Sequence, residues 1–262
     1  MNPNQIYPNI PLPRRNALRY FITACILYAI YALVLLPLSN LFGSNIVFQG
    51  TMLYEIAVFL ITVIELAVFC LAFANTISAR YLYGARAAVR CVLLFAAATA
   101  IRYVATFFVS WRMEGLDLSD LMFELLFLVI YVLLDVTQVA IVLVVTHLLL
   151  RREDEIYSVR TRALLASQQP LSDRVLHGMT SRSIFALRGP IHIATLISGG
   201  VVLFVRVVGR IIYDVGYGAP TDTADLLWMI FYYVTDIAIA IVCCFVVRYL
   251  VVRLSLGKRN VA

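Results

Sequence analysis

The chain has 262 residues, of which 63% are hydrophobic and only 14% are charged. Soluble domains contain about 45–50% apolar and about 25% charged residues, so this composition excludes an ordinary soluble protein. The formal charge of +6 does not indicate nucleic-acid binding, because the basic residues stand at the ends of apolar runs and do not form a solvated basic face.

Six apolar segments follow one another along the chain, each long enough to cross the roughly 30 Å hydrocarbon core of a bilayer as a helix. We expect these spans at about residues 20–42, 53–77, 88–111, 120–150, 189–213 and 225–252. The first span follows basic residues as a signal peptide would, but no small-residue cleavage site comes after it, so we expect it to be retained. The sequence therefore predicts an all-α, polytopic membrane bundle of six transmembrane helices.

The positions of Arg and Lys predict the orientation of this bundle, because short loops rich in these residues stay in the cytoplasm. About 17 of the 21 basic residues lie before the first span, in the second and fourth connections, and at the end of the chain. We therefore expect both termini in the cytoplasm of a bacterium and the protein in its cytoplasmic membrane. The expected organisation is a cytoplasmic N-terminal segment 1–19, four spans in 20–150, a cytoplasmic connector 151–188, two spans in 189–254 and a cytoplasmic tail 255–262.

The connector 151–188 is the longest hydrophilic segment of the chain. Its first part, Arg152 to Ala166, is compatible with an extension of the fourth helix before Pro170 ends it. We interpret the connector as a solvated linker. The alternative is a contact site for a cytoplasmic or membrane partner. The lipid bilayer is the one partner that the sequence itself implies, and it does not indicate the oligomeric state.

An internal repeat is visible when consecutive spans are grouped into three hairpins. Each hairpin begins with an Arg, has an acid within its second span, and closes with another Arg. From the first Arg to the acid the separations are 50, 49 and 48 residues, and from the acid to the closing Arg they are 15, 16 and 17. This pattern predicts three parallel helical hairpins, related by an axis along the membrane normal. The three sets are Arg15, Glu65 and Arg80; Arg86, Asp135 and Arg151; and Arg188, Asp236 and Arg253.

Five ionisable residues are expected to form one charged layer within the membrane. At about 1.5 Å of rise per residue, they stand roughly 22–27 Å from the inner Arg residues, which is near or just beyond the bilayer midplane. A charge there costs about 2.5–3.5 kcal/mol on insertion scales, so these side chains must face the bundle interior. The layer consists of Glu65, Arg102, Asp135, Arg206 and Asp236.

The count of charges in this layer predicts that one acid lacks a fixed cation, because two Arg residues face three carboxylates. The first span offers only the uncharged Tyr31, Ala32 and Leu33 at the same level. A supporting polar stripe extends the layer, since its members recur at helical spacings from the five charged residues. Such stripes either line a wet pathway or hold helices together. The stripe comprises Asp120, Glu124, Tyr131, Tyr232 and Arg210.

The chemistry that the sequence indicates is limited to this layer. The chain lacks the short motifs of zinc proteases, serine hydrolases and phosphate-binding loops. His147 and His192 have no carboxylate or Cys at ligand spacing, and we expect no metal, no cofactor and no nucleic-acid partner. The favoured hypothesis is a small permease or channel-like subunit that moves an ion, a proton or a small solute. The alternative is a membrane scaffold or an integral subunit of a larger complex, and an intramembrane enzyme is the least favoured.

Overall fold

The computed structural model describes residues 14–35, 37, 52–114, 118–166, 189–217 and 223–256, and these segments form helices. The prediction of an all-α membrane bundle is confirmed: the described residues form six helices, the first of which ends in a π-helical turn. The elements are α1 (Arg14–Ile30) with its π-helical continuation η1 (Tyr31–Leu35), α3 (Met52–Tyr83), α4 (Ala85–Glu114), α5 (Leu118–Ala166), α7 (Pro190–Tyr217) and α8 (Thr223–Leu256).

Five of these helices contain apolar stretches of 23 to 27 residues, long enough to cross a membrane. The first helix is shorter in its described part, where its apolar stretch is Phe21–Leu35. Large apolar side chains such as Phe59, Phe204 and Phe245 are exposed on the outside of the bundle. A water-soluble protein would bury them, whereas lipid solvates them without cost. The chain is therefore an integral membrane protein.

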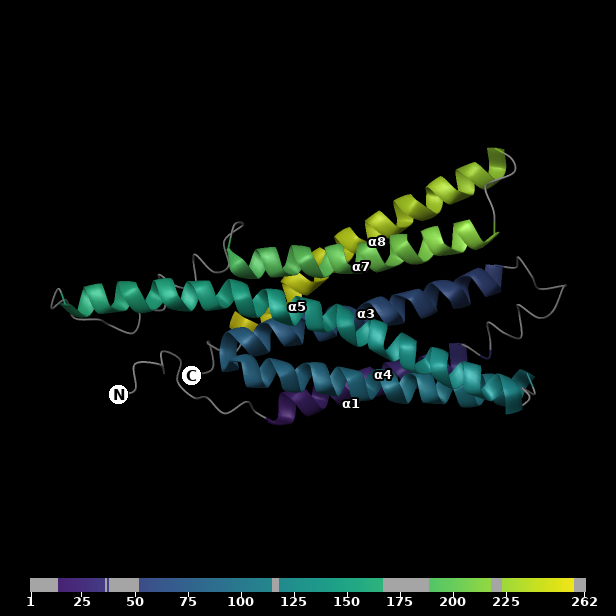
Figure 1. Cartoon of the computed structure of the whole chain (residues 1–262), viewed down its shortest axis with the longest axis horizontal. Helices are drawn as coiled ribbons and strands as arrows, with labels where there is room; N and C mark the ends of the chain where they lie inside the picture. Colours follow the sequence, from purple (N-terminus) through teal and green to yellow (C-terminus); the bar gives the residue numbers. More distant parts are fainter. Residues whose placement is uncertain are drawn as a thin grey trace.

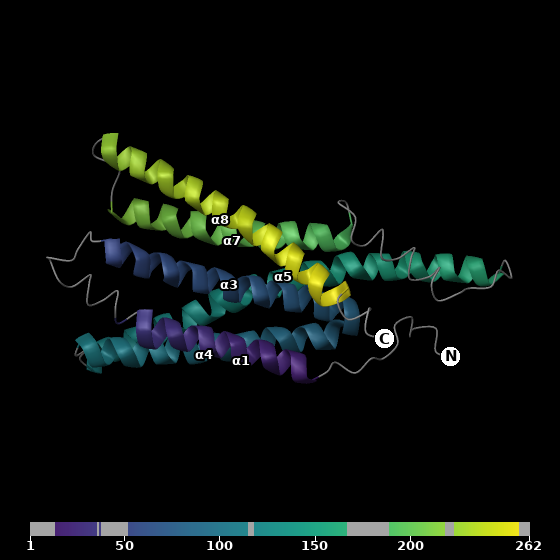
Figure 2. The same cartoon turned by 180° about the vertical axis from the view of Figure 1, so that it is seen from behind.

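Helix α3 lies in the middle of the bundle and contacts α4, α5 and α8. Figures 1 and 2 show α7 and α8 on one side of α3, with α1 and α4 on the other. The consecutive helices α7 and α8 pack along each other, and so do α4 and α5, but α1 packs more on α4 than on α3. The helices of the first hairpin are thus the least closely associated, and the internal repeat stays a prediction.

The connection between α3 and α4 is much tighter than the sequence predicts. The expected spans end at residue 77 and resume at residue 88, yet only Gly84 lies between the two helices. Its φ of 89° is a left-handed conformation that favours glycine, and its N–H donates to the carbonyl oxygen of Arg80 at 3.2 Å. Both helices therefore continue beyond the expected spans towards this turn, because a helix satisfies its own backbone groups in water as well as in lipid.

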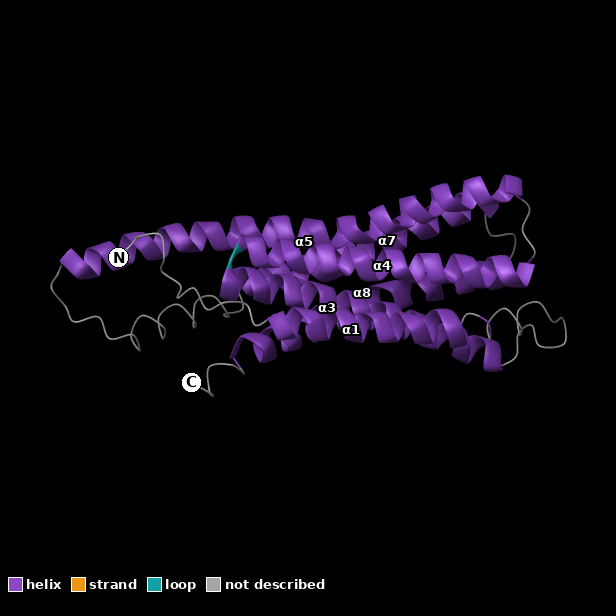
Figure 3. Cartoon of the chain, turned by 90° about the horizontal axis from the view of Figure 1, so that it is seen from below, coloured by secondary structure: helices purple, strands orange, loops and turns teal. Residues whose placement is uncertain are grey.

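Helix α5 is much longer than a bilayer requires. Its 49 residues correspond to about 74 Å at a rise of 1.5 Å per residue. Its C-terminal part extends past the ends of the neighbouring helices (Figures 1 and 3). The expected helical extension to Ala166 is thus present, whereas residues 167–188, with Pro170, lie outside the described part of the chain.

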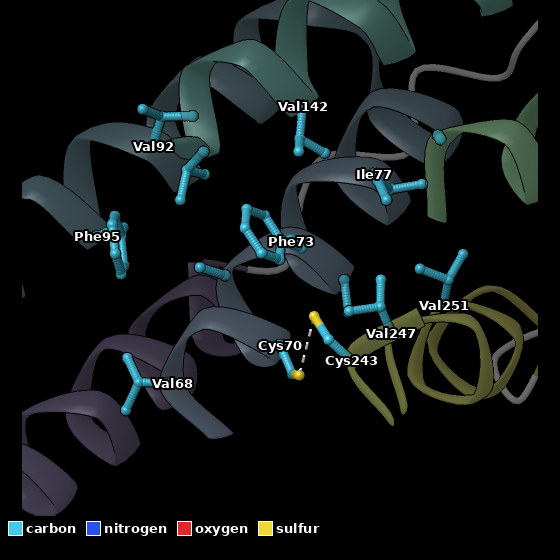
Figure 4. Packing of buried hydrophobic residues seen from close by; sticks show 14 of the residues in the cluster. Val68, Cys70, Phe73, Ile77, Val92, Phe95, Val142, Cys243, Val247 and Val251 are labelled. Carbon is cyan, nitrogen blue, oxygen red and sulfur yellow. Dashed lines mark hydrogen bonds between the residues drawn. The ribbon is translucent and has the colours of Figure 1, made fainter. Parts of the chain in front are cut away.

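Besides residues of α1 and α7, the apolar core joins α3, α4, α5 and α8 around Phe73, which lies between Phe95 and Ile77 in Figure 4. On each of these helices the core lies between the charged residue of the predicted layer and the end at which α3 turns into α4. On α3, for example, Glu65 comes just before the core residues Val68 to Ile77. The packed core thus holds the helices together directly beside the charged layer and fixes its position.

Candidate functional site

The charged layer is divided into two clusters, and the first is centred on Arg102 of α4. Its guanidinium forms an ion pair with Glu65 of α3 and a second one, from Nη1 to Oδ2 at 3.7 Å, with Asp135 of α5. The hydroxyl of Tyr103 donates to Oδ2 of Asp135 at 3.1 Å, and Nε2 of Gln138 donates to Oδ1 at 3.5 Å. One cation therefore joins two carboxylates from two neighbouring helices. We call Arg102, Glu65 and Asp135 the acidic cluster.

Three aromatic rings surround the guanidinium of Arg102. Its central carbon lies 5.2 Å from the ring centroid of Tyr28, 4.6 Å from that of Tyr31 and 4.7 Å from that of Tyr103. A cation within about 6 Å of an aromatic face is attracted by the ring quadrupole. Tyr31 begins the π-helical turn η1, a local distortion often found at functional sites. The first helix therefore contributes rings to the charged layer, although it contributes no charge.

The second cluster is centred on Asp236 of α8. Its Oδ1 lies 3.2 Å from Nη1 of Arg206, and its Oδ2 lies 3.0 Å from Nε of Arg210, both on α7. The guanidinium carbon of Arg210 also lies 4.5 Å from the ring centroid of Tyr232. Here one carboxylate joins two cations. We call Asp236, Arg206 and Arg210 the basic cluster.

The prediction that one acid lacks a cation is wrong for this layer, because each of its three carboxylates contacts an Arg. The prediction gave each Arg a single acid, whereas Arg102 contacts both Glu65 and Asp135. It also left out Arg210 as a partner of Asp236. Arg210 is one helical turn, about 5.4 Å, further along α7, and its long side chain spans that distance. The level of a residue along its helix therefore does not by itself show which basic side chains can reach an acid.

The pairing leaves an excess charge on each cluster. With all groups ionised, the acidic cluster carries one more negative charge than positive, and the basic cluster carries one more positive charge. The central side chains are buried, since Arg102 is 6% and Asp236 is 2% exposed. The outer members are accessible, with exposed side-chain fractions of 30% for Glu65, 29% for Arg206 and 26% for Arg210. The most accessible side chain of the acidic cluster is therefore negative, and the accessible side chains of the basic cluster are positive.

A cavity of about 170 Å³ touches both clusters. It lies among α3, α5 and α7, so it opens on the acids of the first cluster and on Arg206 of the second. Its polar lining is Glu65, Asp135, Gln138 and Arg206, and its apolar lining is Leu66, Phe69, Val202 and Val205. This volume is large enough to hold several water molecules. The site can thus hold water or a small polar solute beside both kinds of charge.

The supporting stripe is only partly described by the structure. Tyr131 stacks on Tyr103 with a centroid distance of 5.8 Å, next to the acidic cluster, and Tyr232 lies beside Arg210. Asp120 and Glu124 belong to α5, but their side chains lie outside the described part of the chain. Tyr131 and Tyr232 therefore lie next to the two clusters, and Arg210 is itself a member of the basic cluster.

Two histidines pair with arginines at the opposite end of the core from the charged layer. Nε of Arg80 donates to Nδ1 of His147 at 3.0 Å, and Nη1 of Arg248 lies 3.1 Å from Nδ1 of His192. These histidines stand on different helices and each has its own Arg partner. Within the described part of the chain, no group of three His, Cys, Asp or Glu could hold a metal ion.

The residues that sequence reasoning missed are Tyr28, Tyr103 and Gln138. Their signals were present in part: Tyr28 stands three positions before Tyr31, and Gln138 stands three positions after Asp135, so each pair shares a helix face. Tyr103 directly follows Arg102, and nothing in the sequence indicates that its hydroxyl reaches across to α5.

The fold and these two clusters define a polytopic integral membrane protein with paired charges inside its helical bundle. No protein family, curated protein or solved structure matches the chain.

Proposed function

We propose that the chain is a small permease or channel-like subunit, which moves an ion, a proton or a small solute through its charged layer. One observation supports this proposal most strongly. Glu65, Asp135 and Arg206 line one cavity within the membrane-spanning helices, although each also has an ion-pair partner. Ionised groups that face a cavity require water or a solute, because lipid cannot solvate them.

The charge balance of the clusters also favours a pathway over simple helix fastening. A structural ion pair is neutral, and pairing one acid with one base would avoid the cost of an excess charge inside a bilayer. Instead, Arg102 pairs with two acids and Asp236 pairs with two bases. Polar contacts between membrane helices stabilise by only about 0.6 kcal/mol on average, so fastening alone is a weak reason for six charges.

Reconstitution into liposomes tests this proposal. Proton flux is followed with an entrapped pH dye, ion currents in planar bilayers, and solute entry by swelling of the liposomes in small polar solutes. We expect Asp135→Asn or Asp236→Asn to reduce the wild-type flux at least about tenfold, since each alters one cluster. Arg253→Gln is the matched control, because it removes an exposed charge at the far end of α8.

Two results would contradict transport. One is wild-type flux no greater than that of empty liposomes in all three assays. The other is unchanged flux in both Asp variants, with all proteins inserted to the same extent.

A second function is favoured by the length of α5. From Arg151 to Ala166 this helix continues beyond its apolar stretch, which ends at Arg151. Such a projecting helix suits a scaffold or an integral subunit of a larger complex. Co-purification from native membranes, with and without residues 157–166, distinguishes this alternative. It loses its support if the detergent-extracted chain migrates alone and the deletion changes no association.

A further inference from the structure

Groups of opposite charge line the same cavity but form no ion pair across it in the described part of the chain. Glu65 and Asp135 line it from α3 and α5, and Arg206 lines it from α7. In the described part of the chain, however, each ion pair of these residues stays within its own cluster. A space with an accessible negative group and an accessible positive group is complementary to a molecule that carries both charges.

We propose that this cavity binds a small zwitterionic solute, whose ammonium group contacts Glu65 and Asp135 while its carboxylate contacts Arg206. That this solute is transported rests on the proposed function, whose substrate class it names. That the solute binds rests only on the cavity and the two clusters.

The charges discriminate against solutes with a single charge. A simple cation attracted to the two acids also meets Arg206, and a simple anion attracted to Arg206 also meets two carboxylates. Like charges at short distance repel strongly where water is scarce. A zwitterion satisfies both sides and brings no net charge into the membrane, so it avoids most of the cost of burying an ion.

The chemistry of Arg206 leaves it able to bind a carboxylate. Its hydrogen bond to Asp236 uses Nη1, whereas a guanidinium has five N–H donors arranged in a planar fork. Such a fork matches the two oxygens of a carboxylate. On the other side, Glu65 and Asp135 together offer carboxylate oxygens to the N–H groups of an ammonium. Leu66 and Val202 provide apolar surface for a short hydrocarbon link between the two charged groups.

The size of the cavity favours a small solute. Pockets for drug-sized ligands have volumes of about 300–1,000 Å³, and this cavity of about 170 Å³ is well below that range. Amino acids whose charges are separated by one, two or three carbons therefore form a suitable series. The amino acid of this series that binds most tightly indicates the distance between the two acids and Arg206.

Two substitutions remove the excess charge of a cluster while keeping its central ion pair. Glu65→Gln leaves Arg102 with Asp135, and Arg206→Gln leaves Asp236 with Arg210. Because the buried Arg102 and Asp236 keep a partner of opposite charge, we expect both variants to fold. Arg253→Gln again serves as the control outside the cavity.

The experiment is calorimetric titration of the full chain in lipid nanodiscs. The probes are glycine, β-alanine and γ-aminobutyrate, with acetate and methylammonium as the corresponding single charges. We expect at least one zwitterion to bind about tenfold or more tightly than both single ions. Glu65→Gln and Arg206→Gln should each weaken it about tenfold or more, as the loss of a charge-assisted hydrogen bond implies, with no change in Arg253→Gln.

The inference is overturned if the single ions bind as tightly as every zwitterion, or if neither cavity variant changes the affinity. Uptake of the same radiolabelled zwitterions into proteoliposomes distinguishes a failure of the binding site from a failure of the proposed transport function. Binding without uptake or any other flux keeps the site and contradicts transport. Proton or ion flux that depends on Asp135, with no zwitterion binding, keeps transport and overturns the zwitterion site.

Discussion

The carboxylate of Asp236 on α8 accepts a hydrogen bond from Nε of Arg210 on α7, with 3.0 Å between the two atoms. Asp236→Ala leaves Arg210 and Arg206 without this carboxylate, and we expect it to lower the free energy of unfolding by about 3–5 kcal/mol. Arg210→Gln should cost clearly less, because Arg206 still pairs with Asp236. Denaturation of both variants in detergent measures the difference, and an equal or smaller loss for Asp236→Ala would contradict the central role of the acid.

The rings around Arg102 give a second prediction. Tyr31→Leu removes an aromatic face that lies 4.6 Å from the guanidinium carbon. A cation–π contact contributes about 0.5–2 kcal/mol, so we expect a loss of that size in the free energy of unfolding. Tyr31→Phe keeps the ring and should retain most of the stability. Thermal unfolding of the two variants tests this point, and equal losses would show that the hydroxyl matters more than the ring.

A third prediction concerns the close approach of α7 and α8 at Gly199. A Cβ atom at this position would meet Sγ of Cys244 and would lie 2.7 Å from the backbone carbonyl oxygen of Ala240. Gly199→Ala must therefore push the two helices apart, and we expect it to destabilise the bundle measurably. Gly200→Ala is the matched control, because nothing lies within 4 Å of its Cβ position.

The control should be neutral or slightly stabilising, since Ala has a higher helix propensity than Gly by about 1 kcal/mol. Melting temperatures of the two variants in the same detergent compare them. If Gly200→Ala destabilises as much as Gly199→Ala, the effect is not caused by the contact with α8.

The fourth prediction uses two cysteines of the core. Sγ of Cys70 on α3 lies 3.6 Å from Sγ of Cys243 on α8, the pair joined by a dashed line in Figure 4. We expect copper-catalysed oxidation in membranes to join them within one chain, as each thiol gives up one proton and one electron to the oxidant. A specific protease site inserted between residues 167 and 188 then yields two fragments, which stay linked until a reductant is added.

Cys70→Ser should abolish this link, whereas Cys244→Ser should leave it intact. Fragments that separate without reductant would contradict the packing of α3 against α8. A link of equal yield in Cys70→Ser would show that another cysteine pair had reacted.

Much of the architecture could be predicted because each spanning helix depends only on residues near one another in the sequence. In a bilayer each helix must satisfy its own backbone hydrogen bonds, so runs of apolar residues indicate the spanning helices directly. A fixed rise per residue also converts sequence position into depth. For this reason the sequence predicted that Glu65, Arg102 and Asp135 lie at a similar level, and the structure joins these three residues in one cluster.

The tertiary structure alone decided which groups meet at that level. Depth does not give the rotation of a helix about its axis or its choice of neighbours, and both depend on packing between residues far apart in the chain. The packing of α1 on α4 brings Tyr28 and Tyr31 to Arg102, and the seating of α7 on α8 brings Arg210 to Asp236. The sequence thus determined a helical membrane bundle and predicted charged residues inside it. Long-range packing divided those charges into an acidic and a basic cluster and left a cavity touching both.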